Sequence, residues 1–193
     1  MLENRYRLPA LIGAFALAQA VSWGMTFNLT AITGTAMATA LGLSYVVVMT
    51  GPTVMLVVMA LVAVPFLRLF ERFGARQVMT ASVAVGALGL ALVGLSTGAW
   101  MFFAGWIVVG AAGAGMLTTA MQIGVAEIAG THARTVIGAL MVFGGLGTAL
   151  CWPVLGALQS AFGWRIATLL GAATLLIWLR PFIGCCWKGV QPM

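Results

Sequence analysis

The chain has 193 residues, of which 63% are hydrophobic and only 6% are charged. A soluble domain usually carries about 25% charged residues, so this composition cannot cover a water-exposed surface and indicates a protein folded in lipid. Nine Lys and Arg against three Asp and Glu give a formal net charge of +6, but the basic residues lie in small groups between apolar runs, which favours a membrane topology signal over nucleic-acid binding.

Six segments are long and apolar enough to cross a membrane as helices, which requires about 20 mostly apolar residues each. They are residues 8–32, 43–66, 77–97, 99–126, 136–159 and 166–183. Backbone polar groups must be paired inside lipid, and the alternating pattern of barrel strands is absent. The sequence therefore predicts an all-α, polytopic membrane protein with six antiparallel spans.

The first segment also resembles a secretory signal peptide. Arg5 and Arg7 precede its apolar run, and Ala18-Gln19-Ala20 has the small-residue spacing of a cleavage site. The apolar run nevertheless continues to about residue 32, which is long enough to span. This length favours an uncleaved transmembrane helix.

Polar residues are spaced three or four apart along one face of this first span. They are Gln19, Ser22, Trp23, Thr26 and Thr30. A polar face in a membrane helix is directed toward a water-accessible cavity or toward a partner helix. For each residue taken alone, both interpretations stay open.

Charge is concentrated in the connector after the second span, PFLRLFERFGARQVM at residues 65–79. Arg68, Glu71, Arg72 and Arg76 lie within it. Placing the N-terminus in the cytoplasm puts nearly all basic residues on that side: Arg5, Arg7, Arg68, Arg72, Arg76, Arg134, Arg180 and Lys188, against Arg165 alone on the other. The positive-inside rule therefore predicts a cytoplasmic N-terminus and a cytoplasmic 68–76 loop.

The fourth span carries a second polar face, made by Thr118, Thr119 and Gln122. Three glycines precede it, at Gly110, Gly113 and Gly115, where we expect close helix packing. Two polar faces in equivalent spans favour a central cavity. Its candidate lining residues are Gln19, Trp23, Thr26, Thr118, Thr119 and Gln122.

A short motif recurs at the junction of spans two and three and again at that of spans five and six. Phe73-Gly74-Ala75-Arg76 reappears as Phe162-Gly163-Trp164-Arg165. Three spans separate the copies, so one lies on each side of the membrane. This arrangement predicts a three-plus-three inverted repeat, as is common in secondary transporters.

The loop, the repeat and the polar faces together resemble the N-terminal half of a Major Facilitator Superfamily transporter, over essentially residues 5–180. The loop signature of that family runs Gly-x-x-x-Asp-Arg-x-Gly-Arg-Arg/Lys. The matching positions here are Leu67, Glu71, Arg72, Gly74, Ala75 and Arg76. The resemblance implies that Glu71, Arg72, Gly74 and Arg76 form a cytoplasmic latch that stabilises one conformation. Leu67 and Ala75 depart from the signature.

Two further family motifs are incomplete. Trp106 stands four residues before Gly110, where many members carry an arginine associated with proton-coupled export. Proton coupling through that position is therefore in doubt. In the fifth span, Pro153 and Gly156 match part of a Gly-Pro-x-x-Gly motif, and the proline can bend the helix. Gly163-Trp164-Arg165 is frequent in bacterial members, which points to the general bacterial branch.

The resemblance implies secondary-active transport of a small solute by alternating access, in a bacterial inner (plasma) membrane and without a cofactor. No Asp, Glu, Lys, Arg or His lies at the middle of a span. An intramembrane enzyme is disfavoured because the chain has no Asp, its lone His132 lies in a loop, and its cysteines lack metal-ligand spacing. Membrane lipid and a small-molecule substrate are the expected partners; nucleic acid is not.

A full transporter of this family contains two such halves. We expect one six-helix bundle over residues 1–180, followed by a tail of altered character at 181–193. The tail is either the product of a truncation or frameshift, or the end of a half-size transporter that works as a homodimer. A non-transporting membrane fragment or partner protein is the alternative function.

Overall fold

A computed structural model describes residues 19–129 and 133–179. The first span is therefore described only from Gln19 onward, and the predicted tail lies outside the described residues. A helix covers residues 19–23 and continues as the π-helix η1 (Gly24–Asn28) and as α2 (Leu29–Leu41). It reaches beyond the predicted end at residue 32. Gly42 terminates it in the left-handed conformation (φ 65°), with its N–H donating to the carbonyl of Ala38.

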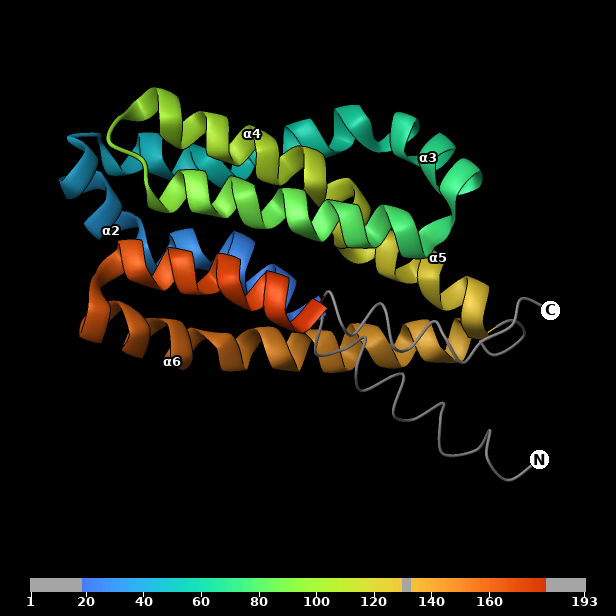
Figure 1. Ribbon diagram of the computed structural model, residues 1–193. Helices are drawn as coiled ribbons and strands as arrows, with labels where there is room; N and C mark the ends of the chain where they lie inside the picture. Colours follow the sequence, from blue (N-terminus) through green and yellow to red (C-terminus); the bar gives the residue numbers. More distant parts are fainter. Residues whose placement is uncertain (1–18, 130–132, 180–193) are drawn as a thin grey trace.

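The next helix, α3 (Tyr45–Gly94), covers both the second and the third predicted span. Ser44 caps its start, since the Ser44 hydroxyl accepts a hydrogen bond of 3.3 Å from the backbone N–H of Val47. Its helical conformation is interrupted at Gly74, which has φ 74° and ψ 158°. Figure 1 shows the consequence, because α3 turns back on itself and its two halves run past one another.

The fourth predicted span is divided in two, as α4 (Ala99–Met116) and α5 (Thr118–Ala129). Leu117 separates them with an extended backbone conformation, φ −90° and ψ −156°. Backbone hydrogen bonds still cross the break, from Leu117 N–H to Gly113 and from Met121 N–H to the Leu117 carbonyl.

The last long helix, α6 (Ala133–Thr174), covers the fifth predicted span and the start of the sixth, which continues in the π-helix η3 (Leu175–Leu179). It is interrupted at Gly163, with φ 78° and ψ 167°. In Figure 1 the orange and red halves of α6 lie antiparallel, as the halves of α3 do.

The described part of the chain is all-helical, which confirms the predicted all-α class, whereas the six-span, three-plus-three arrangement stays a prediction. Three of its helical stretches are long and apolar enough to cross a membrane: Tyr45–Gly94, Ala99–Ala126 and Ala133–Ile177. Gly74 and Gly163 divide α3 and α6 into antiparallel halves, so each of these two stretches extends over two of the spans that the sequence predicts.

The most extensive helix packing among the described elements joins α3 and α4. Two glycines face each other there: a Cβ atom on Gly89 would lie 2.8 Å from the backbone nitrogen of Val109, and one on Gly105 would lie 2.9 Å from that of Val93. Glycine permits this approach because it has no side chain. Large apolar side chains such as Leu61, Leu88 and Leu150 are exposed on the outside of the bundle, as expected for a surface that lipid covers.

Candidate functional site

The predicted polar face of the first helix coincides with a local irregularity of its backbone. The π-helix η1 begins at Gly24, directly after Trp23, and contains Thr26. Such π-helical turns occur often at functional sites, because the extra residue per turn frees backbone groups and redirects side chains. Gln19 and Thr26 are buried, and the Thr26 hydroxyl donates a hydrogen bond of 2.6 Å to the Ser22 carbonyl of its own helix.

The polar face of the fourth span begins at the break between α4 and α5. Thr118 is the first residue of α5, next to the extended Leu117. Thr118 and Gln122 are partly buried, whereas Thr119 is exposed. Helix interruptions at membrane depth are tolerated where the backbone is covered by protein or lines a cavity, and transporters use them to build binding sites.

The two polar faces meet directly. The indole Nε1 of Trp23 donates a hydrogen bond of 3.0 Å to Oγ1 of Thr118, 95 residues along the chain. The Trp23 ring also packs edge-on against Phe27, with centroids 6.0 Å apart. We call the group Trp23, Thr26, Thr118 and Gln122 the polar junction. Of the predicted cavity residues, only Trp23 and Thr118 are joined by a hydrogen bond that the structure records.

Three buried polar atoms on this first helix lack a hydrogen-bond partner among the described residues. They are the Ser22 and Thr30 hydroxyls and the Asn28 side-chain nitrogen. A buried polar group without a partner costs about 1–3 kcal/mol, so such atoms indicate a place where water or a ligand completes the bonding. The sequence analysis missed Asn28, although a lone asparagine within an apolar run is a usable signal.

Trp106 on α4 is fully buried, and its indole nitrogen also lacks a partner among the described residues. Its ring lies against Gly51 of α3: a Cβ atom there would be 2.5 Å from Trp106 Nε1. Trp106 therefore fills this position of α4 with a packed aromatic side chain, which supplies no charge.

The connector at residues 68–76 places its charged side chains on the surface. Glu71, Arg72 and Arg76 are exposed. The Arg72 guanidinium carbon lies 5.2 Å from the centroid of the Phe73 ring, which is within cation–π range. In the described part of the chain no ion pair joins Glu71 to either arginine. The latch assignment thus stays a prediction.

The connector at Gly163 corresponds to the 68–76 connector in the recurring motif, and its arginine forms a hydrogen bond to another part of the bundle. Arg165 Nη2 donates a hydrogen bond of 2.8 Å to the Ser96 carbonyl, between α3 and α4, and its guanidinium lies 4.4 Å from the centroid of the Trp164 ring. The sequence identified Arg165 as the exception to the charge bias and as part of the recurring motif, and did not predict these contacts. Its contacts tie the second half of α6 to the end of α3.

The predicted packing glycines differ in their surroundings. A Cβ atom on Gly110 would lie 2.6 Å from the Met55 carbonyl oxygen, and one on Gly115 would meet Ser82. At Gly113 the nearest atoms are side-chain atoms, at 3.2 Å and beyond. Gly156 has no such neighbour within 4 Å. Pro153 lies inside α6, one turn from Gly156. Their roles in packing and bending stay predictions.

A family model of the Major Facilitator Superfamily matches residues 15–192 of this chain. Among curated proteins no sequence matches it significantly. The match includes the 68–76 connector, the positive-φ glycines Gly42, Gly74 and Gly163, and the polar junction, and it agrees with the all-helical, apolar architecture. The chain therefore belongs to the Major Facilitator Superfamily, a family of membrane transporters.

Proposed function

We propose that this protein forms one six-helix bundle of a secondary transporter that moves a small, neutral or amphipathic solute by alternating access. The observation that carries the proposal is the Trp23–Thr118 hydrogen bond. It joins two polar helix faces at the two places where those helices depart from regular geometry. Polar side chains at interrupted membrane helices are the arrangement from which midplane transporter sites are built.

The six spans are proposed as a three-plus-three inverted repeat. Gly74 and Gly163 support it, because both adopt positive φ with extended ψ at the same point of the recurring Phe-Gly-x-Arg motif. The proposed orientation has a cytoplasmic N-terminus in a bacterial inner membrane, and it follows from the distribution of Lys and Arg.

Alternating access requires a second bundle, against which the first can rock. We propose that a second copy of this chain or a C-terminal half of the transporter supplies it, with the polar junction facing that second bundle. Substrate selectivity would then depend on both bundles.

Accessibility labelling tests this function. Cys151, Cys185 and Cys186 are replaced by Ser, and a single cysteine is introduced at Gln122. Alternating access predicts that a membrane-impermeant maleimide labels the introduced cysteine from either side of oriented vesicles. A bound substrate should change the labelling rate on each side. A cysteine at Leu88, which is exposed on the apolar outer surface, is the matched control and should react from neither side. A Gln122 cysteine that reacts from one side only, at a constant rate, would favour a non-transporting membrane fragment.

The latch is tested separately. Glu71→Gln and Arg72→Ala should shift the ratio of the two labelling rates, since both remove charge from the proposed cytoplasmic latch. Arg134→Gln removes an exposed charge at the start of α6 and should leave the ratio unchanged. An unchanged ratio in all three variants rejects the latch while leaving the transport proposal intact.

A further inference from the structure

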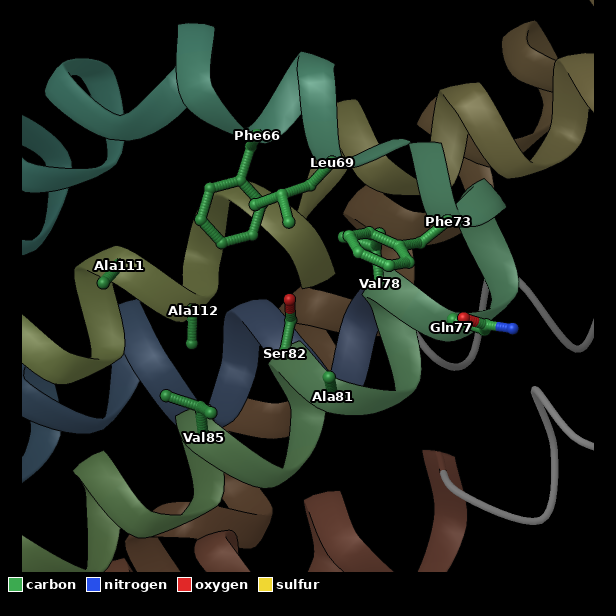
Figure 2. Close-up of a pocket in the computed structure, with 10 residues that line it drawn as sticks. All are labelled: Phe66, Leu69, Phe73, Gln77, Val78, Ala81, Ser82, Val85, Ala111 and Ala112. Carbon is green, nitrogen blue, oxygen red and sulfur yellow. The ribbon is translucent and has the colours of Figure 1, made fainter. Parts of the chain in front are cut away.

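An open apolar pocket lies between the two halves of α3 and the middle of α4. Its volume is about 340 Å³, within the range of about 300–1,000 Å³ typical of sites for small molecules. Figure 2 shows Phe66 and Leu69 above the pocket, Phe73 at the turn, and Val85 with Ala112 at the opposite end. None of the predicted cavity residues lines it.

The pocket opens on the outer surface of the bundle. Leu69, Phe73, Gln77 and Val85 line it and are all exposed. Gln77 and Val85 are eight residues apart on one helix, so the pocket extends roughly 12 Å from the 68–76 connector along α3. Such a slot begins at a membrane boundary and continues into the hydrocarbon region.

Two polar side chains line this apolar space: the exposed Gln77 and the buried Ser82. Ser82 is only 5% exposed, its hydroxyl points toward the Phe66 side of the pocket in Figure 2, and no hydrogen bond to it is recorded among the described residues. Phe66, Val78 and Ala112, which line the pocket with it, are apolar. The interior is therefore suited to a hydrocarbon chain that carries at most one hydrogen-bonding group.

The rim of the pocket is cationic. The Arg72 guanidinium rests on the Phe73 ring, which lines the pocket, and Arg76 directly precedes the lining residue Gln77. Both arginines are exposed. Glu71 is the acidic side chain nearest in sequence, and it forms no recorded ion pair with them.

We propose that this pocket holds one acyl chain of an anionic phospholipid, whose phosphate is bound by Arg72 and Arg76. The inference rests on the proposed placement of the 68–76 connector at a membrane surface. The apolar slot opens to lipid, and Arg72 and Arg76 lie in or beside its connector end. An anionic phospholipid has the complementary features, because it carries an acyl chain and a negatively charged phosphate. A soluble transported solute would instead need access to water. The bound lipid connects residues 66–73 to 77–85 across the Gly74 turn.

Photocrosslinking in vesicles tests the proposal. Purified protein is reconstituted in phosphatidylcholine vesicles containing phosphatidylglycerol with a diazirine in its acyl chain, and the crosslinked peptides are mapped by mass spectrometry. Crosslinks should concentrate in residues 66–85, and unlabelled phosphatidylglycerol should compete better than phosphatidylcholine. Each arginine should contribute roughly fivefold to that preference, so Arg72→Gln/Arg76→Gln should nearly abolish it. Arg134→Gln, which removes one exposed positive charge that does not line the pocket, is the control and should preserve it.

A second pair of variants tests the pocket itself. Ala111→Phe fills the slot from α4 and should remove the crosslinks whichever headgroup is used. Ala104→Phe adds the same ring to an exposed position of α4 outside the lining and should not. Crosslinks spread evenly over the outer surface, or equal competition by both lipids in the wild-type protein, would mean ordinary annular lipid and overturn the proposal. Because no transport is measured, a failure here is separate from a failure of the proposed function.

Discussion

Trp23 and Thr118 are joined by a hydrogen bond of 3.0 Å, although 95 residues separate them in the chain. Each belongs to a helix whose regular geometry is interrupted beside it, by the π-helix η1 in one case and by Leu117 in the other. The bond therefore fixes two irregular helix segments relative to each other.

Trp23→Phe and Thr118→Val each remove one partner of that bond. Hydrogen bonds between membrane helices contribute about 0.6 kcal/mol on average, so a double-mutant cycle of unfolding free energies should give a coupling near that value. Transport should lose substrate affinity in both single variants. Thr39→Val is the control, because the Thr39 hydroxyl donates only to the Thr35 carbonyl of its own helix. If the two substitutions have additive effects on the free energy of unfolding, the hydrogen bond contributes nothing to stability.

The sequence predicted the all-helical class and located both polar faces, because hydropathy and helical spacing are local properties. It could not predict which residues meet. The Trp23–Thr118 bond depends on how two distant helices pack, and the break at Leu117 lies in an ordinary apolar run with no proline. Asn28, by contrast, was visible in the sequence and was overlooked.

Gly74→Ala and Gly163→Ala should both destabilise the protein. Each glycine has positive φ with extended ψ, a conformation that residues with a side chain adopt only at a cost of about 1–3 kcal/mol. Thermal unfolding in detergent micelles measures the loss. Gly156→Ala is the matched control, since that glycine is helical and has open space around it, and alanine should be neutral or stabilising by about 0.5–1 kcal/mol. Equal stability of all three variants would contradict the backbone assignment.

The contact between α3 and α4 should be disrupted by larger side chains at Gly89 and Gly105. A side chain at either position would meet backbone atoms closer than 3 Å, and backbone cannot move aside as a flexible side chain can. Gly89→Leu and Gly105→Leu should each cost about 1–3 kcal/mol or more, measured as a lower unfolding temperature. Gly138→Leu, at a position with nothing within 4 Å, should be tolerated. A Gly105→Leu protein as stable as Gly138→Leu would rule out the close packing.

These two glycines illustrate what the sequence lacked. It pointed to Gly110, Gly113 and Gly115 because they cluster beside a polar face, yet glycine is so abundant, with 25 in the chain, that spacing alone does not select the pairs in contact. The choice depends on the crossing point of two helices, which only the three-dimensional arrangement determines.

Membrane orientation is tested with two single-cysteine variants in the background without native cysteines. Trp100→Cys replaces a side chain that is 92% exposed between the third and fourth predicted spans, and Arg68→Cys replaces one in the charged connector. In intact cells an impermeant maleimide should label Trp100→Cys and should not label Arg68→Cys, as the positive-inside rule requires. Tyr45→Cys should behave like Trp100→Cys, since both lie on the same predicted side. Labelling of Arg68→Cys alone would reverse the topology.

Arg165 is expected to contribute to stability and not to orientation. Its hydrogen bond to the Ser96 carbonyl and its stacking on Trp164 depend on a planar, charged guanidinium, so Arg165→Gln and Arg165→Lys should both weaken the junction of α3 and α6. Because the side chain is exposed, the loss should be only about 1 kcal/mol, measured by unfolding at low and high salt. Arg134→Gln serves as the control for a lost surface charge.

Removing Arg165 also increases the charge difference across the membrane in the proposed orientation, so a loss of stability in Arg165→Gln cannot arise from inverted insertion. An unchanged unfolding temperature in both Arg165 variants would show that the Ser96 contact contributes nothing.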